Sequence, residues 1–166
     1  MGDKHMNDSV KKDEPPGRSK KKRRYQDKKW NDWIWQFKNR ITTLEQLEKV
    51  TLLSPQERSG IENSHRKFSM AITPYFASIL DPQNPNCPLR KQVIPSIEES
   101  HLSQADLQDP CGEDTHSPVP GLVHRYPDRV LLLATNRCAT YCRYCTRRRM
   151  VGNNESSITD ENLQEI

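Results

Sequence analysis

The sequence is poor in apolar residues. Hydrophobic residues make up 33% of its 166 positions and aromatic residues 7%, while charged residues make up 29%; a typical globular domain has a larger apolar share. The chain has no run of the ~20 apolar residues that span a bilayer. No apolar segment follows the basic N-terminus, which argues against a secretory signal. We therefore expect that only part of the chain packs into a core, and we expect no membrane partner.

Cysteine pairs suited to structural disulfides are also lacking. The chain has five cysteines, and three of them fall within eight residues. Such close spacing is typical of metal and cluster sites rather than of disulfides. We therefore expect a reducing, cytoplasmic compartment. Cys87 and Cys111 have no partner at metal-ligand spacing, so each is expected to be a free or buried thiol.

Positive charge is concentrated at the start of the chain. Residues 1–24 contain nine Lys or Arg and four acidic residues, in a polar, proline-containing composition that is typical of a disordered tail. The rest of the chain is close to neutral. The run Lys20–Arg24 suits contact with nucleic acid or an address signal, but a solvated tail is the commoner outcome for a short basic run. We therefore do not expect a nucleic-acid partner.

Residues 25–80 are predicted to form a helical segment. Apolar residues in its first part recur at three- and four-residue steps, which places them on one face of a helix. Packing of that face on its own domain is favoured over binding to a partner. The residues of this stripe are Trp30, Trp33, Ile34, Phe37, Ile41 and Leu44.

Three helix start signals follow the stripe. Each combines a capping side chain with a suitable residue in the first turn. The second helix is expected to run to about Lys67 and the third to Leu80, before a stop at Asp81-Pro82. The three signals are Thr43 with Gln46, Ser54 with Pro55 and Glu57, and Thr73 with Pro74.

The second half of the chain is predicted to begin an α/β fold. Residues 81–129 show no sustained period and are expected to form an extended loop region. Val130–Thr135 is a short unbroken apolar run, as in a parallel strand buried on both faces, and a helix is expected from Glu161. Residues 130–166 thus predict a first βα unit. Because a parallel sheet needs more than one strand, we expect the chain to be truncated.

The loop after this strand carries Cys138, Cys142 and Cys145 in the spacing CxxxCxxC. A [4Fe–4S] cluster normally has one thiolate on each of its four irons, so three thiolates leave one iron open to a small molecule. Radical S-adenosylmethionine (SAM) enzymes bind S-adenosyl-L-methionine at that iron and pass it one electron. Tyr144 agrees with this hypothesis, because an aromatic residue at that position commonly flanks the adenine in this superfamily.

Two other kinds of site also use closely spaced cysteines. Structural zinc normally has four ligands, often in two CxxC-like pairs, and no close fourth partner is present. A ferredoxin has CxxCxxC with a further cysteine and a following proline. A zinc- and nucleic-acid-binding module stays open as the alternative from another functional class.

The flanking sequence resembles the lysine 2,3-aminomutases. The resemblance covers residues 25–166 and implies the N-terminal part of such an enzyme, with the start of a partial (β/α) barrel of the radical SAM type. The implied reaction converts L-lysine to L-β-lysine, and related enzymes with the same chemistry act on glutamate, arginine or a protein-bound lysine. The matching segments are Ser117–Leu133 with its HRYPDR run, the CxxxCxxC loop, Thr146–Arg149, Trp30–Leu44 and Cys87–Pro95.

The resemblance also implies roles for single residues. Arg125 and Arg129 match arginines that hold the phosphate of pyridoxal 5′-phosphate, with Tyr126 as a possible helper, and planar guanidinium groups suit phosphate oxygens. Arg147 matches the arginine that pairs with the substrate carboxylate.

Other parts of the enzyme are implied to lie outside this chain. They include the Schiff-base lysine, the acidic residues that bind the substrate ε-ammonium group and a set of zinc-binding cysteines. We therefore expect this fragment to be inactive alone. The implied partners of the full-length enzyme are the amino-acid substrate, a reductant protein such as ferredoxin or flavodoxin, and further copies of itself.

Overall fold

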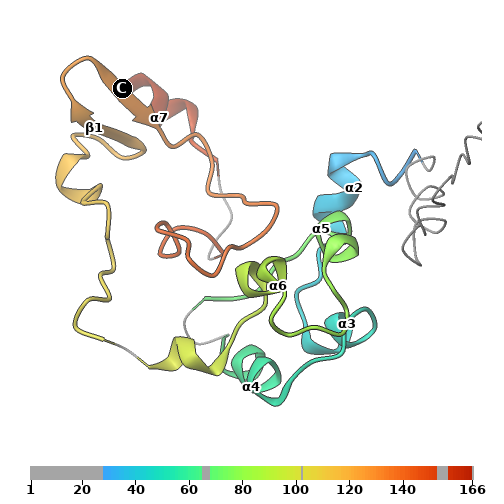
Figure 1. The fold of residues 1–166 in the computed structure, drawn as a ribbon. Coiled ribbons are helices and arrows are strands. Elements are labelled where there is room, and N and C mark those ends of the chain that lie inside the picture. The colour runs from blue at the N-terminus through green and yellow to red at the C-terminus, as the bar shows by residue number, and fades with distance from the viewer. Residues whose placement is uncertain (1–27, 65–67, 102, 153–156, 166) are drawn as a thin grey trace, which may run out of the picture.

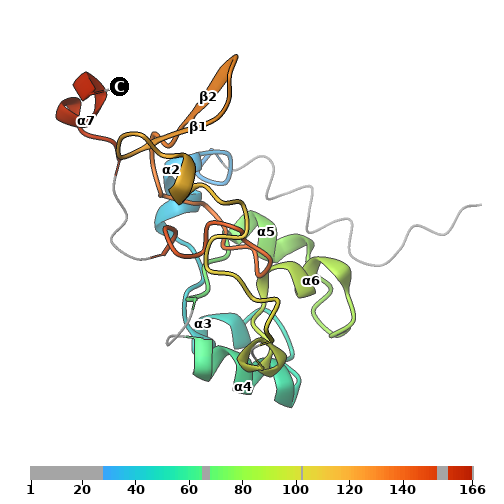
Figure 2. The ribbon, with the colours of Figure 1, turned by 90° about the vertical axis from the view of Figure 1, so that its left-hand side faces the viewer.

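The computed structural model describes residues 28–64, 68–101, 103–152 and 157–165. The predicted disordered tail, residues 1–24, lies outside them. The helices α2 to α6 gather in one group, and the strands β1 and β2 lie apart from it with helix α7 (Figure 1). The loop that carries the three motif cysteines runs between the two groups. In the side view of Figure 2, helix α7 and the hairpin lie above α3 to α6, and α2 overlaps the base of the hairpin.

The helical group contains five short α-helices. Its start signals are confirmed: the Thr43 hydroxyl accepts a hydrogen bond from the Gln46 amide at 3.3 Å, and the Ser54 hydroxyl accepts one from the Glu57 amide at 3.2 Å. Thr73 caps its helix in the same way. The predicted end at Lys67 lies outside the described residues. The helices are α2 (Trp33–Lys38), α3 (Leu44–Glu48), α4 (Pro55–Ser64), α5 (Pro74–Ile79) and α6 (Pro88–Val93).

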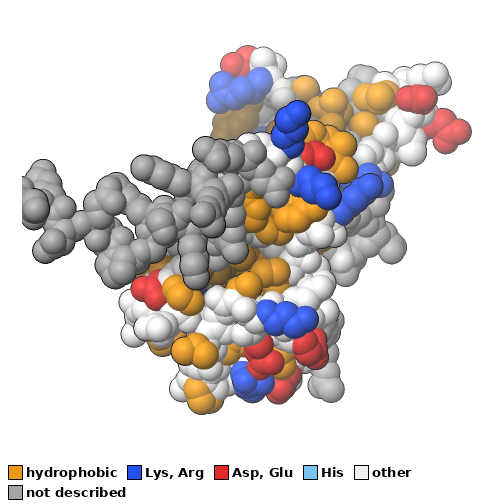
Figure 3. Space-filling view, turned by 90° about the vertical axis from the view of Figure 1, so that its right-hand side faces the viewer, with side chains coloured by type: hydrophobic (Ala, Val, Ile, Leu, Met, Phe, Trp, Pro, Cys, Tyr) orange, Lys and Arg blue, Asp and Glu red, His pale blue; other side chains and the backbone are white. Residues whose placement is uncertain are grey.

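The predicted Trp-rich helical face is wrong. Helix α2 ends at Lys38, because Ile41 leaves the helix to form an antiparallel bridge with Ile72, with N–O distances of 2.7 and 3.0 Å. As a result Trp33 is 74% exposed, and Ile34 is exposed as well. Hydrophobic side chains also reach the surface on the face drawn in Figure 3, with Lys and Arg side chains beside them.

The core of the helical group is apolar and is crossed by one buried ion pair. Its buried residues are Leu47, Ile61, Met70, Ile72, Leu80, Val93 and Ile94. Arg90 of α6 is fully buried and bonds Glu57 of α4, with Nη2–Oε2 at 2.7 Å and Nε–Oε1 at 3.1 Å. It also donates to the carbonyls of Leu52 and Asp81. Arg90 thereby ties α6 to the start of α4.

The predicted loop region, residues 81–129, contains regular elements. Besides α6 it holds two 3₁₀ helices, η1 (Ile97–Ser100) and η2 (Asp114–His116), and the strand β1 (Leu122–Tyr126). Each spans six residues or fewer, too short to produce a sustained period. At Gly60 a side chain would meet the Ser96 backbone at 2.5 Å, so glycine lets α4 and η1 come close together.

The predicted parallel strand buried on both faces is also wrong. The observed strand β2 (Arg129–Leu132) pairs antiparallel with β1, with Leu122 opposite Leu132 and Val123 opposite Leu131. All four residues of β2 are exposed. Its apolar run reflects a surface that the described residues leave uncovered. The predicted C-terminal helix is confirmed as α7 (Asp160–Glu165), so the described residues form a mixed α/β structure without a barrel.

Candidate functional site: a cysteine loop and two arginine grooves

The cysteine loop is held against the helical group by its backbone. The amide of Tyr141 donates to the carbonyl of Ala71 at 2.9 Å, and the amide of Arg143 donates to the carbonyl of Gln92 in α6 at 2.8 Å. The Tyr141 ring is buried and stacks on Phe68, with ring centroids 5.5 Å apart. The path of this loop is therefore set by residues far away in the sequence.

Arg143 anchors the same loop through its side chain. Its Nη2 atom lies 2.7 Å from Oε2 of Glu99 in η1. The guanidinium also donates to the carbonyls of Phe68 and Ser69, at 3.1 Å each. The Arg143 side chain is only 7% exposed, so a residue that lies between Cys142 and Cys145 in the sequence is tied to the helical group by a buried guanidinium.

Arg40 fastens the other end of the loop. Its Nη1 atom donates to the carbonyl of Cys138 at 2.7 Å, and its guanidinium lies over the Phe37 ring at 3.8 Å. Sequence reasoning did not single out Arg40 or Arg143, because an arginine carries no sign of partners tens of residues away.

The three motif thiols are half-buried, and none is in a disulfide. Cys138 and Cys145 pack against a small apolar cluster, and Sγ of Cys138 donates to the Thr140 carbonyl at 3.3 Å. Three thiols on one anchored loop fit the donor chemistry of an iron–sulfur cluster. In the described part of the chain, however, no three His, Cys, Asp or Glu side chains form a group that could hold a metal ion. The cluster ligands therefore stay a prediction.

Tyr144, the predicted neighbour of the adenine, is an exposed residue of this loop. Its hydroxyl donates to Oε1 of Gln92 at 3.4 Å. The structure thus leaves the ring at the surface beside the cysteines, and its predicted contact remains a prediction.

The predicted phosphate-binding residues come together on the β1–β2 hairpin. Arg125, Tyr126 and Arg129 line one groove of about 410 Å³, which we call the hairpin groove. The Arg129 guanidinium lies over the Tyr126 ring at 4.5 Å. Nη1 of Arg125 donates to the Cys111 carbonyl at 2.9 Å, and Cys111 and Glu113 form another wall of the groove. Two exposed cations facing one groove suit a phosphate.

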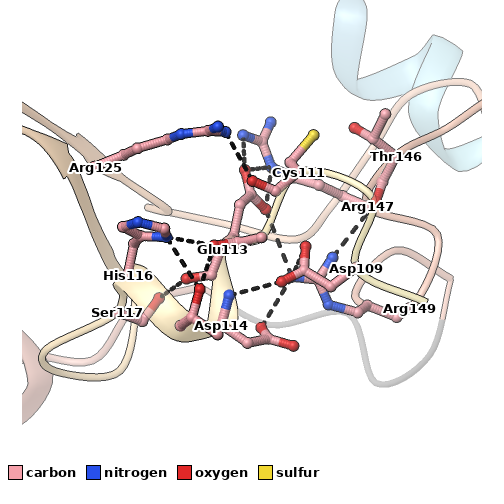
Figure 4. Close-up of polar contacts among 12 residues, drawn as sticks. Asp109, Cys111, Glu113, Asp114, His116, Ser117, Arg125, Thr146, Arg147 and Arg149 are labelled. Atoms are coloured by element: carbon pink, nitrogen blue, oxygen red, sulfur yellow. Dashed lines mark hydrogen bonds and ion pairs between the residues drawn. The ribbon is translucent and has the colours of Figure 1, made fainter. Parts of the chain in front are cut away.

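Arg147, the predicted carboxylate-binding residue, is paired with Glu113. Nε of Arg147 lies 3.0 Å from Oε1 and 3.1 Å from Oε2 of Glu113, and Nη2 lies 2.5 Å from Oε1 (Figure 4). The Glu113 carboxylate is almost completely buried. Arg147 also lines a second groove of about 290 Å³ with Gly121, Leu133 and Ile158 among its walls, which we call the Arg147 groove.

Arg149 binds the same acidic segment. Its Nη2 atom lies 2.9 Å from Asp114 Oδ1, 3.3 Å from Asp109 Oδ1 and 3.6 Å from Glu113 Oε2. The contact with Asp109 is an ion pair without hydrogen-bond geometry, since Oδ1 accepts no hydrogen bond. The other oxygen, Oδ2, accepts one from the Asp114 amide at 2.8 Å.

These contacts shift the pKa of Arg147 and that of one acid, Asp109. The hydrogen bond with Glu113 is the main reason that the pKa of Arg147 is raised; burial opposes it, and the negative charge of Glu113 adds to the rise. The pKa of Asp109 is lowered, mainly because its carboxylate accepts the hydrogen bond from the Asp114 amide. Arg147 therefore stays fully charged beside its paired carboxylate.

Sequence reasoning missed Glu113 altogether. The residue lies in a Pro- and Asp-rich stretch without periodicity, where one more acidic residue carries no signal. Only the fold brings it to Arg147, 34 positions further along the chain.

Over the ranges that the structure describes, no helix is both long and apolar enough to cross a bilayer.

No family model matches the chain, but curated proteins do. L-lysine 2,3-aminomutase of Clostridium subterminale is 53% identical over 137 residues, which make up 82% of this chain and 33% of that protein. L-lysine 2,3-aminomutase of Bacillus subtilis is 54% identical over 76% of this chain and 27% of its own length. Glutamate 2,3-aminomutase of Clostridioides difficile is 39% identical over 82% of this chain and 32% of its own length. The chain thus spans about a third of the length of these relatives.

Proposed function

This chain is homologous to the N-terminal part of L-lysine 2,3-aminomutase, and on that premise we propose that it supplies the iron–sulfur loop and part of two binding sites of a radical SAM aminomutase. The enzyme converts L-lysine to L-β-lysine by moving the amino group from carbon 2 to carbon 3. The observation that carries the proposal is the 53% identity over 137 residues with the Clostridium subterminale enzyme.

Each residue role in the proposal is carried over from the resemblance to the family and agrees with the chemistry of the side chain. Cys138, Cys142 and Cys145 hold three irons of a [4Fe–4S] cluster, and Tyr144 lies against the adenine of S-adenosyl-L-methionine. The cluster with this nucleotide supplies one-electron chemistry, and pyridoxal 5′-phosphate supplies a carrier for the migrating amino group.

The arginines bind and orient the anionic groups. Arg125 and Arg129, helped by Tyr126, hold the pyridoxal phosphate group, a role supported by their position in the hairpin groove. Arg147 pairs with the carboxylate of the amino-acid substrate, for which a guanidinium is the natural bidentate partner. The loop anchors Arg40 and Arg143 keep the cysteines beside the helical group.

The rest of the enzyme is part of the same proposal. A partial (β/α) barrel covers the exposed strand β2 and carries the Schiff-base lysine and the residues that bind the substrate ε-ammonium group. The full-length enzyme takes its electron from a small reductant protein and forms a homo-oligomer. Lysine is the favoured substrate over glutamate, because the chain is 53% identical to a lysine enzyme and 39% identical to a glutamate enzyme.

The cluster is tested on this chain itself. After anaerobic reconstitution with iron and sulfide, we expect a brown protein with four irons per chain. Cys138→Ala lowers the iron and sulfide content and the visible absorption. Cys111→Ala is the matched control, because Cys111 is also a half-buried free thiol but lies outside the motif. A colourless protein with stoichiometric zinc would instead support the zinc-binding module.

The reaction is tested in the full-length aminomutase that carries this segment, built where necessary by joining it to the remaining part of the Clostridium subterminale enzyme. We expect reductive cleavage of S-adenosyl-L-methionine and formation of β-lysine from L-lysine. Glutamate and arginine serve as competing substrates. If a protein with a complete cluster does not cleave S-adenosyl-L-methionine, the proposal is wrong.

A further inference from the structure

Glu113 holds only one edge of the Arg147 guanidinium. A guanidinium offers two edges to carboxylates, one formed by Nε with one terminal nitrogen and one formed by the two terminal nitrogens. Glu113 occupies the first edge, through Nε and Nη2. Among the described residues, no hydrogen bond or ion pair is made by Nη1. Glu113 therefore fixes the orientation of the Arg147 guanidinium and leaves the edge that contains Nη1 available as a donor.

The backbone around Glu113 is itself fixed. Gly112 adopts φ +62°, a left-handed conformation that other residues rarely adopt. The hydroxyl of Ser117 donates to the Glu113 carbonyl at 2.8 Å across η2. The backbone on both sides of Glu113 is thus held in place, by the conformation of Gly112 before it and by the Ser117 hydrogen bond after it.

The same short segment contacts the hairpin arginine. The Cys111 carbonyl accepts a hydrogen bond from Arg125 at 2.9 Å, and two residues later Glu113 binds Arg147. Figure 4 shows Arg125 and Arg147 reaching this segment from different parts of the chain. Glu113 lines the hairpin groove and Arg147 lines the other, so the pair lies where the two grooves adjoin.

We propose that Glu113 is a positioning residue for substrate binding: by holding the Nε edge of Arg147, it sets the other edge to receive the carboxylate of the amino-acid substrate at a fixed distance from the phosphate-binding Arg125. This inference rests on the proposed function. It adds a role for a buried acid that neither the motif nor the spacing of the cysteines indicates.

The test uses Glu113→Gln in the holoenzyme that contains this segment. Glutamine keeps the length and one acceptor oxygen but loses the charge that orders the guanidinium. We expect the KM for L-lysine to rise at least about tenfold, because hydrogen bonds between charged groups are stronger than those to a neutral amide. We expect kcat to change less than about threefold. The matched control is Asp114→Asn, because Asp114 is exposed and binds Arg149 rather than Arg147.

A second ligand separates positioning from a general loss of structure. L-lysine amide has a neutral carboxamide in place of the carboxylate, so its affinity, measured by the change in pyridoxal phosphate absorption, should differ less than about twofold between wild type and Glu113→Gln. Equal losses for both ligands, or lower cluster and cofactor contents, assign Glu113 a structural role and overturn the inference. A lower KM would mean that Glu113 competes with substrate for Arg147, which also overturns it.

The two proposals fail in different ways. A wild-type holoenzyme that neither binds nor converts lysine overturns the proposed function and the Glu113 inference together. An active wild-type enzyme with an unchanged KM in Glu113→Gln overturns the inference alone.

Discussion

The helical group and the hairpin region differ in where their apolar residues lie. In the helical group, residues such as Leu47 and Ile72 are fully buried and their helices cover one another. In the hairpin, every residue of β2 is exposed, although Val130, Leu131 and Leu132 are as apolar as core residues. The first region therefore buries its apolar side chains within itself, whereas the second buries Leu122 and Val123 of β1 but leaves the apolar side chains of β2 uncovered. The cysteine loop belongs to both, because it is anchored on the helical group and continues from the hairpin.

The sharpest test of this difference is Arg90→Ala in the helical group. It leaves Glu57 as a buried charge without its partner, and removing one member of a buried pair costs about 3–5 kcal/mol. The side chains of Arg90 and Glu57 are 0% and 10% exposed. We expect a correspondingly lower free energy of unfolding, measured by urea denaturation with far-UV circular dichroism.

Arg58→Ala is the matched control for that substitution. Arg58 pairs with Glu48 at the surface of the same group, with side chains 50% and 35% exposed. Surface pairs contribute at most about 1 kcal/mol. Equal effects of the two substitutions would show that Arg90 does not tie α6 to α4 in solution.

A pair of leucine substitutions compares the two regions directly. Leu47→Ala opens a cavity in the helical core and should cost about 3 kcal/mol. Leu132→Ala removes a side chain that is 42% exposed and should cost less than about 1 kcal/mol in this chain. Both are measured by urea denaturation. A Leu132→Ala effect as large as that of Leu47→Ala would mean that β2 is covered when the chain is free in solution.

The contrast also explains which elements the sequence predicts. Capping boxes at Thr43 and Ser54 depend on residues three positions apart, so they can be read locally. The end of α2 depends on the Ile41–Ile72 bridge, whose partners are far apart, and no local pattern announces it. The sequence predicts a buried strand at β2, but the strand is exposed. An apolar run indicates that a strand needs a covering surface, and it does not indicate whether this chain supplies that surface.

The residues of the candidate site likewise fall into those that the sequence predicts and those that only the fold brings together. Cysteine spacing alone predicts the motif residues, and resemblance alone supplies the roles of Arg125, Arg129 and Arg147. The supporting residues, Arg143 and Glu113, could not be predicted, because their partners come together only through tertiary packing.

The smallest expected effect concerns the pH dependence of the segment that links the two regions. Asp109 has a lowered pKa, mainly because its carboxylate accepts a hydrogen bond from the Asp114 amide. A depressed carboxyl pKa contributes stability that is present above the ordinary value of 3.8 and is lost as the pH falls through the lower folded value. Tracking the Asp114 amide by NMR should therefore show a transition with a midpoint below 3.8.

Asp109→Asn separates this contact from the rest of the acidic cluster. The amide oxygen of asparagine can still accept the hydrogen bond, but it does not titrate, so the transition at the Asp114 amide should disappear while the Glu113–Arg147 pair persists. That pair has its own hydrogen bonds and does not need Asp109. If the transition survives in Asp109→Asn, the titrating group is another acid of the segment, and the hydrogen bond from the Asp114 amide to Asp109 does not cause it.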